Sequence, residues 1–210
     1  MVKAKLSDVS VKPVNVIEDC QSDFLPKLCS RAYADIGFKS TMEYGRRLLK
    51  RYMANGLVQV FDGHGGKHAV DFAFHHLPKY ILEDENFPSD IERIVTSAFL
   101  QTDKAFAEAC SLDAALASGT TALAALVIGM LLVVANVGDC RAVLCHHGKA
   151  IEMSRDHKPI CSKEKKRIEA SGGYIYDGYL NGQLNVARAL GDWHMEKLSV
   201  ENFMNGKIKC

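Results

Sequence analysis

The residues from Thr120 to Val137 include no charged side chain, and this stretch constrains the fold more than any other part of the sequence. Its length approaches the minimum for a membrane-spanning helix. Gly129 interrupts the stretch, β-branched residues are frequent in it, and the charged residues Asp139 and Arg141 follow closely. These features favour two buried strands joined by a tight turn near Gly129-Met130 over a membrane helix.

Helical periodicity precedes this stretch. Apolar residues recur at helical spacing over 67–85, where Pro78 is expected to kink or divide the helix. A second helix is predicted to begin at the capping box Ser89–Glu92 and to bury one apolar face. That face consists of Ile91, Ile94, Val95, Ala98, Phe99, Thr102 and Phe106.

Strand patterns surround the charge-free centre and follow it. A short helix is expected over 162–171, ending at Gly172-Gly173, and a hairpin is expected at Asn181-Gly182. Residues 1–30 show no clear period and are interpreted as a loosely held leader. The order of elements predicts a layered α/β (α+β) fold with helices on antiparallel sheet and two sheets face to face. The predicted strands are 120–128, 131–137, 140–146 and 149–153.

The charge balance and the cysteines argue against two classes of protein. Lysine and arginine number 26 against 25 aspartates and glutamates, a formal net charge of +1, whereas a dedicated nucleic-acid binder usually carries a basic face. The basic run 45–52 is interpreted as a solvated helix face, with a docking patch as the alternative. The seven cysteines form no CxxC pair and no secretory signal opens the chain. This disfavours zinc and predicts an intracellular location, cytoplasmic and/or nuclear.

The segment VFDGHGGKH at 60–68 places an aspartate at the exit of a predicted strand. Reactive side chains are common at such exits, and the glycines after Asp62 let a backbone carbonyl approach a ligand, because no β-carbon is in the way. A carboxylate beside an accessible carbonyl suits a hard cation such as Mg²⁺ or Mn²⁺. The alternative is a glycine-rich turn with a solvated acid and a spectator histidine, His64.

Four stretches, in this order and at these spacings, resemble the metal-dependent protein phosphatases of the type 2C serine/threonine family, and in particular its plant members. The similarity runs from about Ser30 to His194. It implies an antiparallel β-sandwich flanked by helices, which agrees with the α/β fold predicted from the element order. The stretches are MEY at 42–44, FDGHGG at 61–66, SGTTA at 118–122 with NVGDCRAVL at 136–144, and DGYLNGQLNVARALGDWH at 177–194.

The resemblance implies a pair of Mg²⁺ or Mn²⁺ ions flanking a water, which attacks the phosphorus of a phosphoserine or phosphothreonine. Asp62 would bridge the two ions, and the Gly63 carbonyl would bind one of them. Glu43 would hold the second ion, partly through water. Asp139 matches the acid that serves a weaker third metal in some relatives.

The resemblance also assigns two residues to catalysis. Lys39 would grip the phosphate, and His64 would be the general acid for the departing seryl or threonyl oxygen, a task that suits an imidazole near its usual pKa. The expected function is therefore a protein serine/threonine phosphatase. Its partners would be phosphoserine and phosphothreonine proteins, with no nucleic acid and no membrane.

The sequence departs from the family pattern in three respects. Tyr44 stands where the family has an acid after Glu43, a basic segment replaces the apolar strand that follows, and no aspartate comes after Asp192. Because charge count sets the strength of oxygen-ligand metal sites, the alternative is a catalytically impaired protein that binds substrates or partners of active relatives.

A sandwich lacking the family's C-terminal part also predicts association through an exposed sheet edge. The expected organisation is a leader at 1–30, a partial phosphatase domain at 31–194 and an unrelated tail at 195–210.

Structural roles are expected for the remaining conspicuous residues. Trp193 is expected to pack, and Arg188 and Asp192 are expected to form a structural pair near the hairpin. His75-His76 are assigned to a helix end and His146-His147 to a hairpin turn, rather than to metal ligands.

Overall fold

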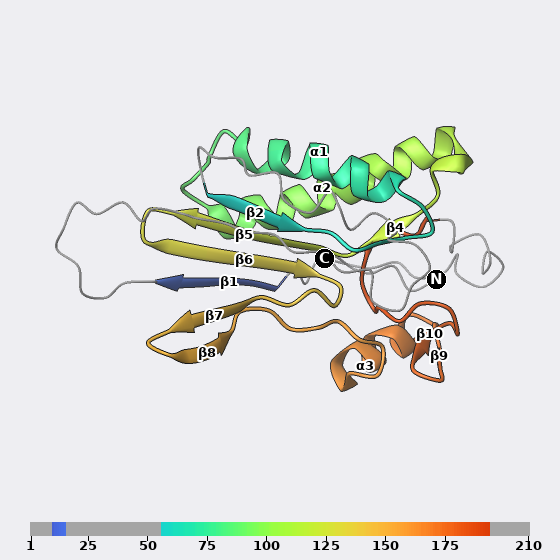
Figure 1. The fold of residues 1–210 in the computed structure, drawn as a ribbon. Coiled ribbons are helices and arrows are strands. Elements are labelled where there is room, and N and C mark those ends of the chain that lie inside the picture. Colours follow the sequence, from blue (N-terminus) through green and yellow to red (C-terminus); the bar gives the residue numbers. More distant parts are fainter. Residues whose placement is uncertain (1–9, 16–55, 194–210) are drawn as a thin grey trace.

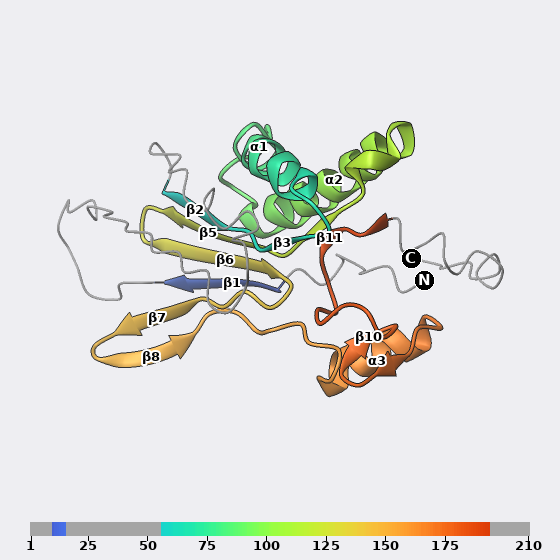
Figure 2. The same cartoon turned by 45° about the vertical axis from the view of Figure 1, so that its right-hand side comes forward.

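The computed structural model describes the backbone of residues 10–15 and the whole of residues 56–193. Within these residues, a main sheet lies between a pair of helices on one face and a β-hairpin on the other (Figure 1, Figure 2). The predicted α/β layering of antiparallel sheet and helices is therefore confirmed. No helix in the described part of the chain is long and apolar enough to cross a membrane.

The charge-free stretch forms the centre of the main sheet, as predicted. Strands β5 (Ala122–Ile128) and β6 (Leu131–Val137) pair antiparallel along their whole length. Gly129, in the turn between them, has a φ of +56°, a left-handed conformation that glycine adopts without strain. Strand β2 (Leu57–Val60) pairs with the other edge of β5, so the order across the sheet is β1-β6-β5-β2.

Strand β1 (Ser10–Asn15) lies within the leader for which no regular structure was predicted. It pairs antiparallel with β6, with Ser10 opposite Asn136 and Asn15 opposite Leu131. The prediction of a loosely held leader does not hold for these residues. The physical reason for this failure is that the hydrogen-bonding partner of β1 comes from a strand far along the chain, so the leader itself carries no local strand pattern.

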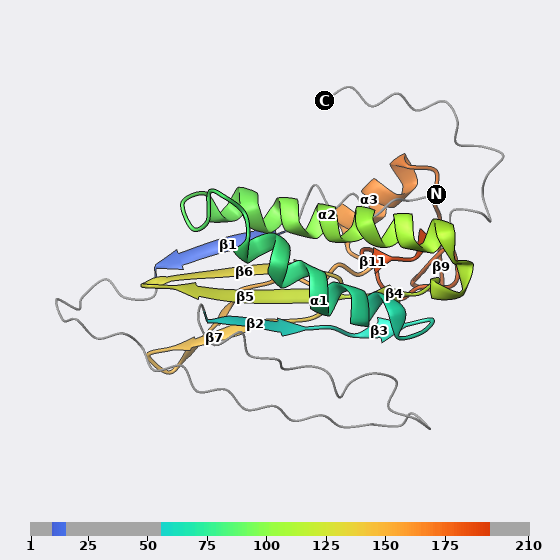
Figure 3. The same ribbon diagram turned by 90° about the horizontal axis from the view of Figure 1, so that it is seen from above.

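Helices α1 (His68–Leu82) and α2 (Ile91–Leu112) lie side by side over one face of the main sheet (Figure 3). Pro78 lies inside α1 and does not divide it. The apolar face predicted for α2 is buried at every position. The predicted capping box is wrong, because the N-cap is Asp90, whose carboxylate accepts a hydrogen bond from Arg93 Nε at 2.8 Å and none from the backbone of the first turn.

The main core fills the space between these helices and the sheet. Burying one of its large apolar side chains stabilises the fold by roughly 1.5–3 kcal/mol, so this layer is what holds the sheet in place for the polar residues at its end. The fully buried side chains include Leu57, Leu77, Ile81, Ile94, Phe99, Leu126 and Val133.

A hairpin of β7 (Val143–His146) and β8 (Lys149–Glu152) packs on the opposite face of the main sheet (Figure 1). Leu144 and Met153 join side chains of β5 and β6 in a second, smaller core. In the connecting turn, His147-Gly148 have φ values of +49° and +72°, which match the twist of a two-residue hairpin. Of His146-His147, which were assigned to a hairpin turn, His147 lies in the turn and His146 is the last residue of β7.

Helix α3 (Ser162–Ala170) ends where it was predicted to end. Gly172 N donates to Glu169 O and Gly173 N donates to Ile168 O, both at 3.0 Å. These two bonds are those of a Schellman motif, in which a left-handed glycine satisfies the last carbonyls of the helix.

The hairpin after α3 turns at Asp177-Gly178 and not at Asn181-Gly182. Strands β9 (Ile175–Tyr176) and β10 (Tyr179–Leu180) pair directly across Asp177-Gly178. Both dipeptides have positive φ at both residues, but the second one returns the chain only to an isolated bridge between Leu180 and Leu184. The prediction failed because the two turns have the same local chemistry.

A second sheet of short strands, in the order β11-β4-β3, stands beside these layers. Strand β3 (Gly63–His64) pairs with β4 (Gly119–Thr120), which pairs in turn with β11 (Leu190–Gly191). A 3₁₀ helix, Ala114–Leu116, leads from α2 into β4. Asp62 lies at the exit of β2 as predicted, and the extended backbone resumes at Gly63 because β4 offers it a partner.

Candidate functional site

The short-stranded sheet brings together three of the motifs singled out in the sequence. Strand β3 carries the DGHGG residues, β4 carries SGTTA, and β11 carries ARALGDW. The residues are far apart in the chain, and antiparallel pairing places them side by side. The candidate site is built on this sheet.

Asp62 lies between β2 and β3 with its side chain exposed. Its backbone is fixed on both sides by one residue: Asp62 N donates to Thr121 Oγ1 at 3.1 Å, and Thr121 N donates to Asp62 O at 3.0 Å. The carboxylate has no hydrogen-bond or ion-pair partner among residues 56–193. A rigid backbone therefore presents an unpaired carboxylate to solvent at the exit of a strand.

His64 and Asp192 form the closest polar contact of the site. His64 Nε2 lies 2.9 Å from each carboxylate oxygen of Asp192, across 128 positions of the chain. Burial by itself would lower the pKa of His64. The hydrogen bond and the negative charge of Asp192 outweigh burial, with help from Asp62 and Asp139, and raise this pKa above its usual value.

The predicted structural pair of Arg188 with Asp192 is wrong. Asp192 contacts His64, whereas Arg188 forms its ion pair with Glu164. The reason is that Gly191 and His64 both pair with Gly119, which brings the residue after Gly191 to the His64 side chain. Trp193 is held by more than packing, because its indole Nε1 donates to Asp103 Oδ1 at 3.1 Å.

Gly119 leaves the room that the His64–Asp192 contact needs. A β-carbon added at Gly119 would collide with Asp192 Oδ1 and with His64 Nε2. Ser118, the residue before it, ties the site to α1: its Oγ accepts a hydrogen bond from Ala69 N at 3.0 Å and donates to Leu116 O at 2.9 Å. Ser118 thereby supplies the helix cap that α1 lacks from its own N-cap residue.

Asp139 follows β6 and forms an ion pair with Lys158 Nζ. Both side chains are about three-quarters buried. The candidate acid for a third metal is therefore neutralised by a lysine in this structure. A metal ion at Asp139 would have to displace the ammonium group of Lys158.

Two predicted site residues, Glu43 and Lys39, lie outside the described residues, so their positions relative to Asp62 stay predictions. Among residues 56–193, no group of three or more histidine, cysteine, aspartate and glutamate side chains is arranged to hold a metal ion. His75 and His76 lie inside α1 rather than at its end, and each Nδ1 donates to a carbonyl four residues earlier. They act within the helix and not at the site.

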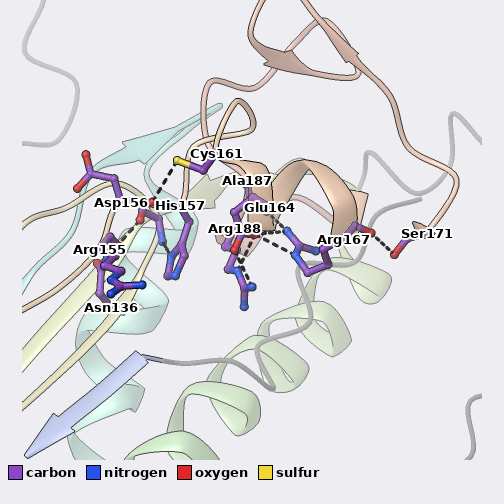
Figure 4. A network of polar contacts seen from close by, with 11 residues as sticks. Asn136, Arg155, Asp156, His157, Cys161, Glu164, Arg167, Ser171, Ala187 and Arg188 are labelled. Atoms are coloured by element: carbon purple, nitrogen blue, oxygen red, sulfur yellow. Dashed lines mark hydrogen bonds and ion pairs between the residues drawn. The ribbon is translucent and has the colours of Figure 1, made fainter. Parts of the chain in front are cut away.

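A buried ion network beside the site was missed by the sequence reasoning (Figure 4). Arg188 donates to both carboxylate oxygens of Glu164, with distances of 2.9 Å from Nε and 2.8 Å from Nη2. Arg167 Nε also donates to Glu164, at 2.9 Å, and Arg167 Nη2 donates to Ala187 O at 2.6 Å. The network joins α3 to the segment that leads into β11. Glu164 is one of two acids on a highly charged helix, so no sequence signal marked it as buried.

Comparison with known proteins gives matches that agree with these motifs. The family model described as protein phosphatase 2C matches residues 32–205. The probable protein phosphatase 2C 22 of Arabidopsis thaliana is 60% identical over 207 residues, which cover 93% of this chain and 53% of that protein. The probable protein phosphatase 2C 57 of Oryza sativa subsp. japonica is 61% identical over 184 residues, covering 82% of this chain and 50% of that protein. The chain thus spans about half the length of the curated relatives it matches.

Solved structures also match. A C. elegans sex determining protein superposes with a TM-score of 0.61 at 27% identity, covering 69% of this chain and 38% of that one. A phosphatase from Toxoplasma gondii superposes with a TM-score of 0.52 at 22% identity, covering 65% of this chain and 56% of that one. The second match supports the fold alone.

Proposed function

The chain belongs to the protein phosphatase 2C family, and from this premise we propose that it is a metal-dependent protein serine/threonine phosphatase. Its substrates would be proteins that carry phosphoserine or phosphothreonine. The observation that carries the proposal lies in the sheet β11-β4-β3. There Asp62, whose carboxylate has no partner among residues 56–193, stands two residues from His64, and the imidazole of His64 is paired with the buried Asp192.

The donor atoms around Asp62 fit a hard cation in kind. The Asp62 carboxylate and the Gly63 carbonyl are oxygen ligands of the sort that Mg²⁺ and Mn²⁺ prefer. Asp62 is exposed and carries no competing ion pair with the described residues. Glu43 would complete the set for the second ion, and Asp139 would join only after release from Lys158. When bound, the ions would supply an activated water and neutralise charge on the phosphate.

The side chains of the chain itself would supply the proton and hold the substrate. As water oxygen bonds to phosphorus, the bond from phosphorus to the seryl or threonyl oxygen breaks and its electron pair stays on that oxygen. His64 would give this oxygen a proton, since an alkoxide is a poor leaving group without one. Lys39 would pair with the phosphate oxygens. A raised pKa suits His64 to this role, because the group must hold its proton before the transfer.

The test is phosphate release from a phosphothreonine peptide as a function of added Mn²⁺. We expect release that depends on the metal and that Asp62→Asn abolishes. The matched control is Glu92→Gln, which removes an exposed carboxylate at the far end of α2 and should leave the rate unchanged. Release without added metal, or release that survives Asp62→Asn, would contradict the proposal.

A second candidate is a phosphatase-like protein that binds phosphorylated substrates or partners of active relatives without turnover. The ion pair of Lys158 with Asp139 favours it, as does Tyr44 in the place of an acid. The two candidates separate in one assay pair. The binding protein would retain a phosphothreonine peptide, measured by fluorescence anisotropy, and would release no phosphate from it at any Mn²⁺ concentration.

A further inference from the structure

The buried carboxylate of Asp192 has a hydrogen-bond partner in the structure. Only 7% of Asp192 is exposed, and a buried carboxylate is costly unless a hydrogen-bond donor or a positive charge faces it. Among the described residues, the partner of its two oxygens is His64 Nε2. The contact therefore accounts for the position of the Asp192 side chain.

The backbone around Asp192 is held in an unfavourable conformation. A φ of +57° is uncommon for a residue other than glycine. Both neighbours are anchored to one acid, because Gly191 N and Trp193 Nε1 donate to Asp103 Oδ1 at 2.9 Å and 3.1 Å. Asp192 N itself donates to Ser118 O at 3.0 Å. Strained residues that are fixed by so many contacts are a feature of functional sites.

The contact determines which nitrogen of His64 can serve a substrate. Nε2 faces Asp192, so Nδ1, on the other side of the ring, is the nitrogen left for a leaving oxygen. Gly119 keeps the two side chains close enough for this arrangement, since any β-carbon there would push them apart. An imidazole with one nitrogen held by a carboxylate has a fixed orientation, and fixed orientation is what proton transfer in a transition state requires.

We propose that Asp192 is a positioning residue for His64, which it holds by Nε2 so that Nδ1 faces the leaving oxygen of a phosphoseryl or phosphothreonyl substrate. This inference rests on the proposed phosphatase function. Asp192 does not touch the phosphate and acts only through the imidazole. Gly119 is the second member of the arrangement, as the residue that admits the contact.

The test compares two substrates that differ in their need for a proton. Threonyl oxygen needs one to leave, whereas the nitrophenolate of p-nitrophenyl phosphate leaves readily without one. We expect Asp192→Asn to lower kcat for a phosphothreonine peptide by roughly 10- to 100-fold, with KM unchanged and kcat for p-nitrophenyl phosphate within about 3-fold. His64→Gln should likewise lower kcat for the peptide far more than kcat for p-nitrophenyl phosphate. The double variant should have the same kcat for the peptide as His64→Gln alone.

The matched control is Asp177→Asn, the same chemical change at a residue with φ of +50° in the β9–β10 turn. It should leave kcat unchanged for both substrates. Asparagine tolerates left-handed backbone, so Asp192→Asn should fold, and Gly119→Ala provides an independent variant with the same expected split. Equal losses on the two substrates, or no loss on the peptide, would overturn the proposal.

A readout without turnover separates this proposal from the proposed function. In ¹⁵N NMR of the histidine rings, His64 Nε2 should carry a hydrogen-bonded proton, and Asp192→Asn should shift its resonance upfield because a neutral amide is a weaker acceptor than a carboxylate. If the chain releases no phosphate from either substrate, the proposed function fails. The NMR signal still shows whether Asp192 holds the His64 ring. An Nε2 signal that Asp192→Asn leaves unchanged would overturn the positioning role, whatever the activity.

Discussion

His157 and Gly138 hold two loops together through a reciprocal pair of hydrogen bonds. His157 N donates to Gly138 O at 2.9 Å, and Gly138 N donates to His157 Nδ1 at 3.1 Å. The second bond requires Nδ1 to be without a proton. Burial first, and then the positive charge of Arg188, lower the pKa of His157 to about 4. Gly138 precedes Asp139, so the contact also fixes the loop that carries a candidate metal ligand.

The lowered pKa of His157 predicts sensitivity to acid. Between about pH 6.5 and pH 4 the unfolded chain binds a proton at this residue and the folded chain does not. The contribution of His157 to the free energy of unfolding should therefore have its full value above pH 6.5. It should fall by roughly 2–3 kcal/mol as the pH drops to 4. Urea unfolding followed by circular dichroism across this range measures the loss.

The control for this prediction is His157→Asn. Its Oδ1 can accept the hydrogen bond from Gly138 N as Nδ1 does, but the amide does not titrate. The difference in pH dependence between the two proteins isolates His157 from His64, whose raised pKa acts in the opposite direction. Parallel stability curves for the two proteins between pH 4 and 6.5 would show that His157 is not the acid-sensitive group.

The pair of Arg188 and Glu164 predicts a large stability effect of a single substitution. Burial acts to raise the pKa of Glu164, but the hydrogen bonds and charge of Arg188, followed by Arg167, lower it, so the carboxylate stays ionised inside the protein. Arg188→Met should cost about 3 kcal/mol or more in the free energy of unfolding, because it leaves a buried charge with less compensation. Urea denaturation at neutral pH checks this value.

Arg141→Met is the matched control for that substitution. Arg141 also binds a carboxylate with two nitrogens, that of Asp156, but its side chain is 58% exposed. Exposed ion pairs contribute about 0–1 kcal/mol. Equal losses for the two variants would mean that burial does not determine the contribution of these pairs.

Much of the fold was predictable because the patterns that encode it are local. The charge-free stretch and its central glycine predict β5 and β6, and the periodicity after residue 90 predicts the buried face of α2. Strand β1 was missed, since its regularity comes from pairing with β6 and not from its own residues. The hairpin at Asp177-Gly178 was misplaced because turn chemistry shows where a chain can reverse and not which strands pair.

The candidate site was predictable only in part, for a related reason. Asp62 and His64 stand within one motif, and the resemblance assigned roles to both. The contact of His64 with Asp192 joins residues 128 positions apart and depends on the clearance at Gly119. Nothing in the residues around Asp192 distinguishes a carboxylate that faces His64 from one that faces Arg188. Only the pairing of β11 with β4 decides between them.

The ion pair between Lys158 and Asp139 competes with any metal ion at Asp139, so a substitution that removes it should strengthen metal binding. Lys158→Met removes the ammonium group that neutralises Asp139 and leaves a side chain of similar length. If Asp139 is a metal ligand, its free charge should tighten Mn²⁺ binding severalfold. Calorimetric titration with Mn²⁺ measures this, with Lys163→Met on the exposed face of α3 as the control. Unchanged Mn²⁺ binding in Lys158→Met would exclude Asp139 from the site.

The metal site itself predicts a ranking of two acids. Asp62 would contact both ions from a backbone fixed by Thr121, whereas Glu43 would contact one ion, partly through water. Asp62→Asn should therefore weaken Mn²⁺ binding by at least about tenfold, and Glu43→Gln should weaken it less. Both changes remove one charge and keep the shape of the side chain, so each serves as the control for the other. Calorimetric Mn²⁺ titrations of the two variants decide the ranking. Equal losses, or no loss for Asp62→Asn, would place the metal elsewhere than at the DGHGG loop.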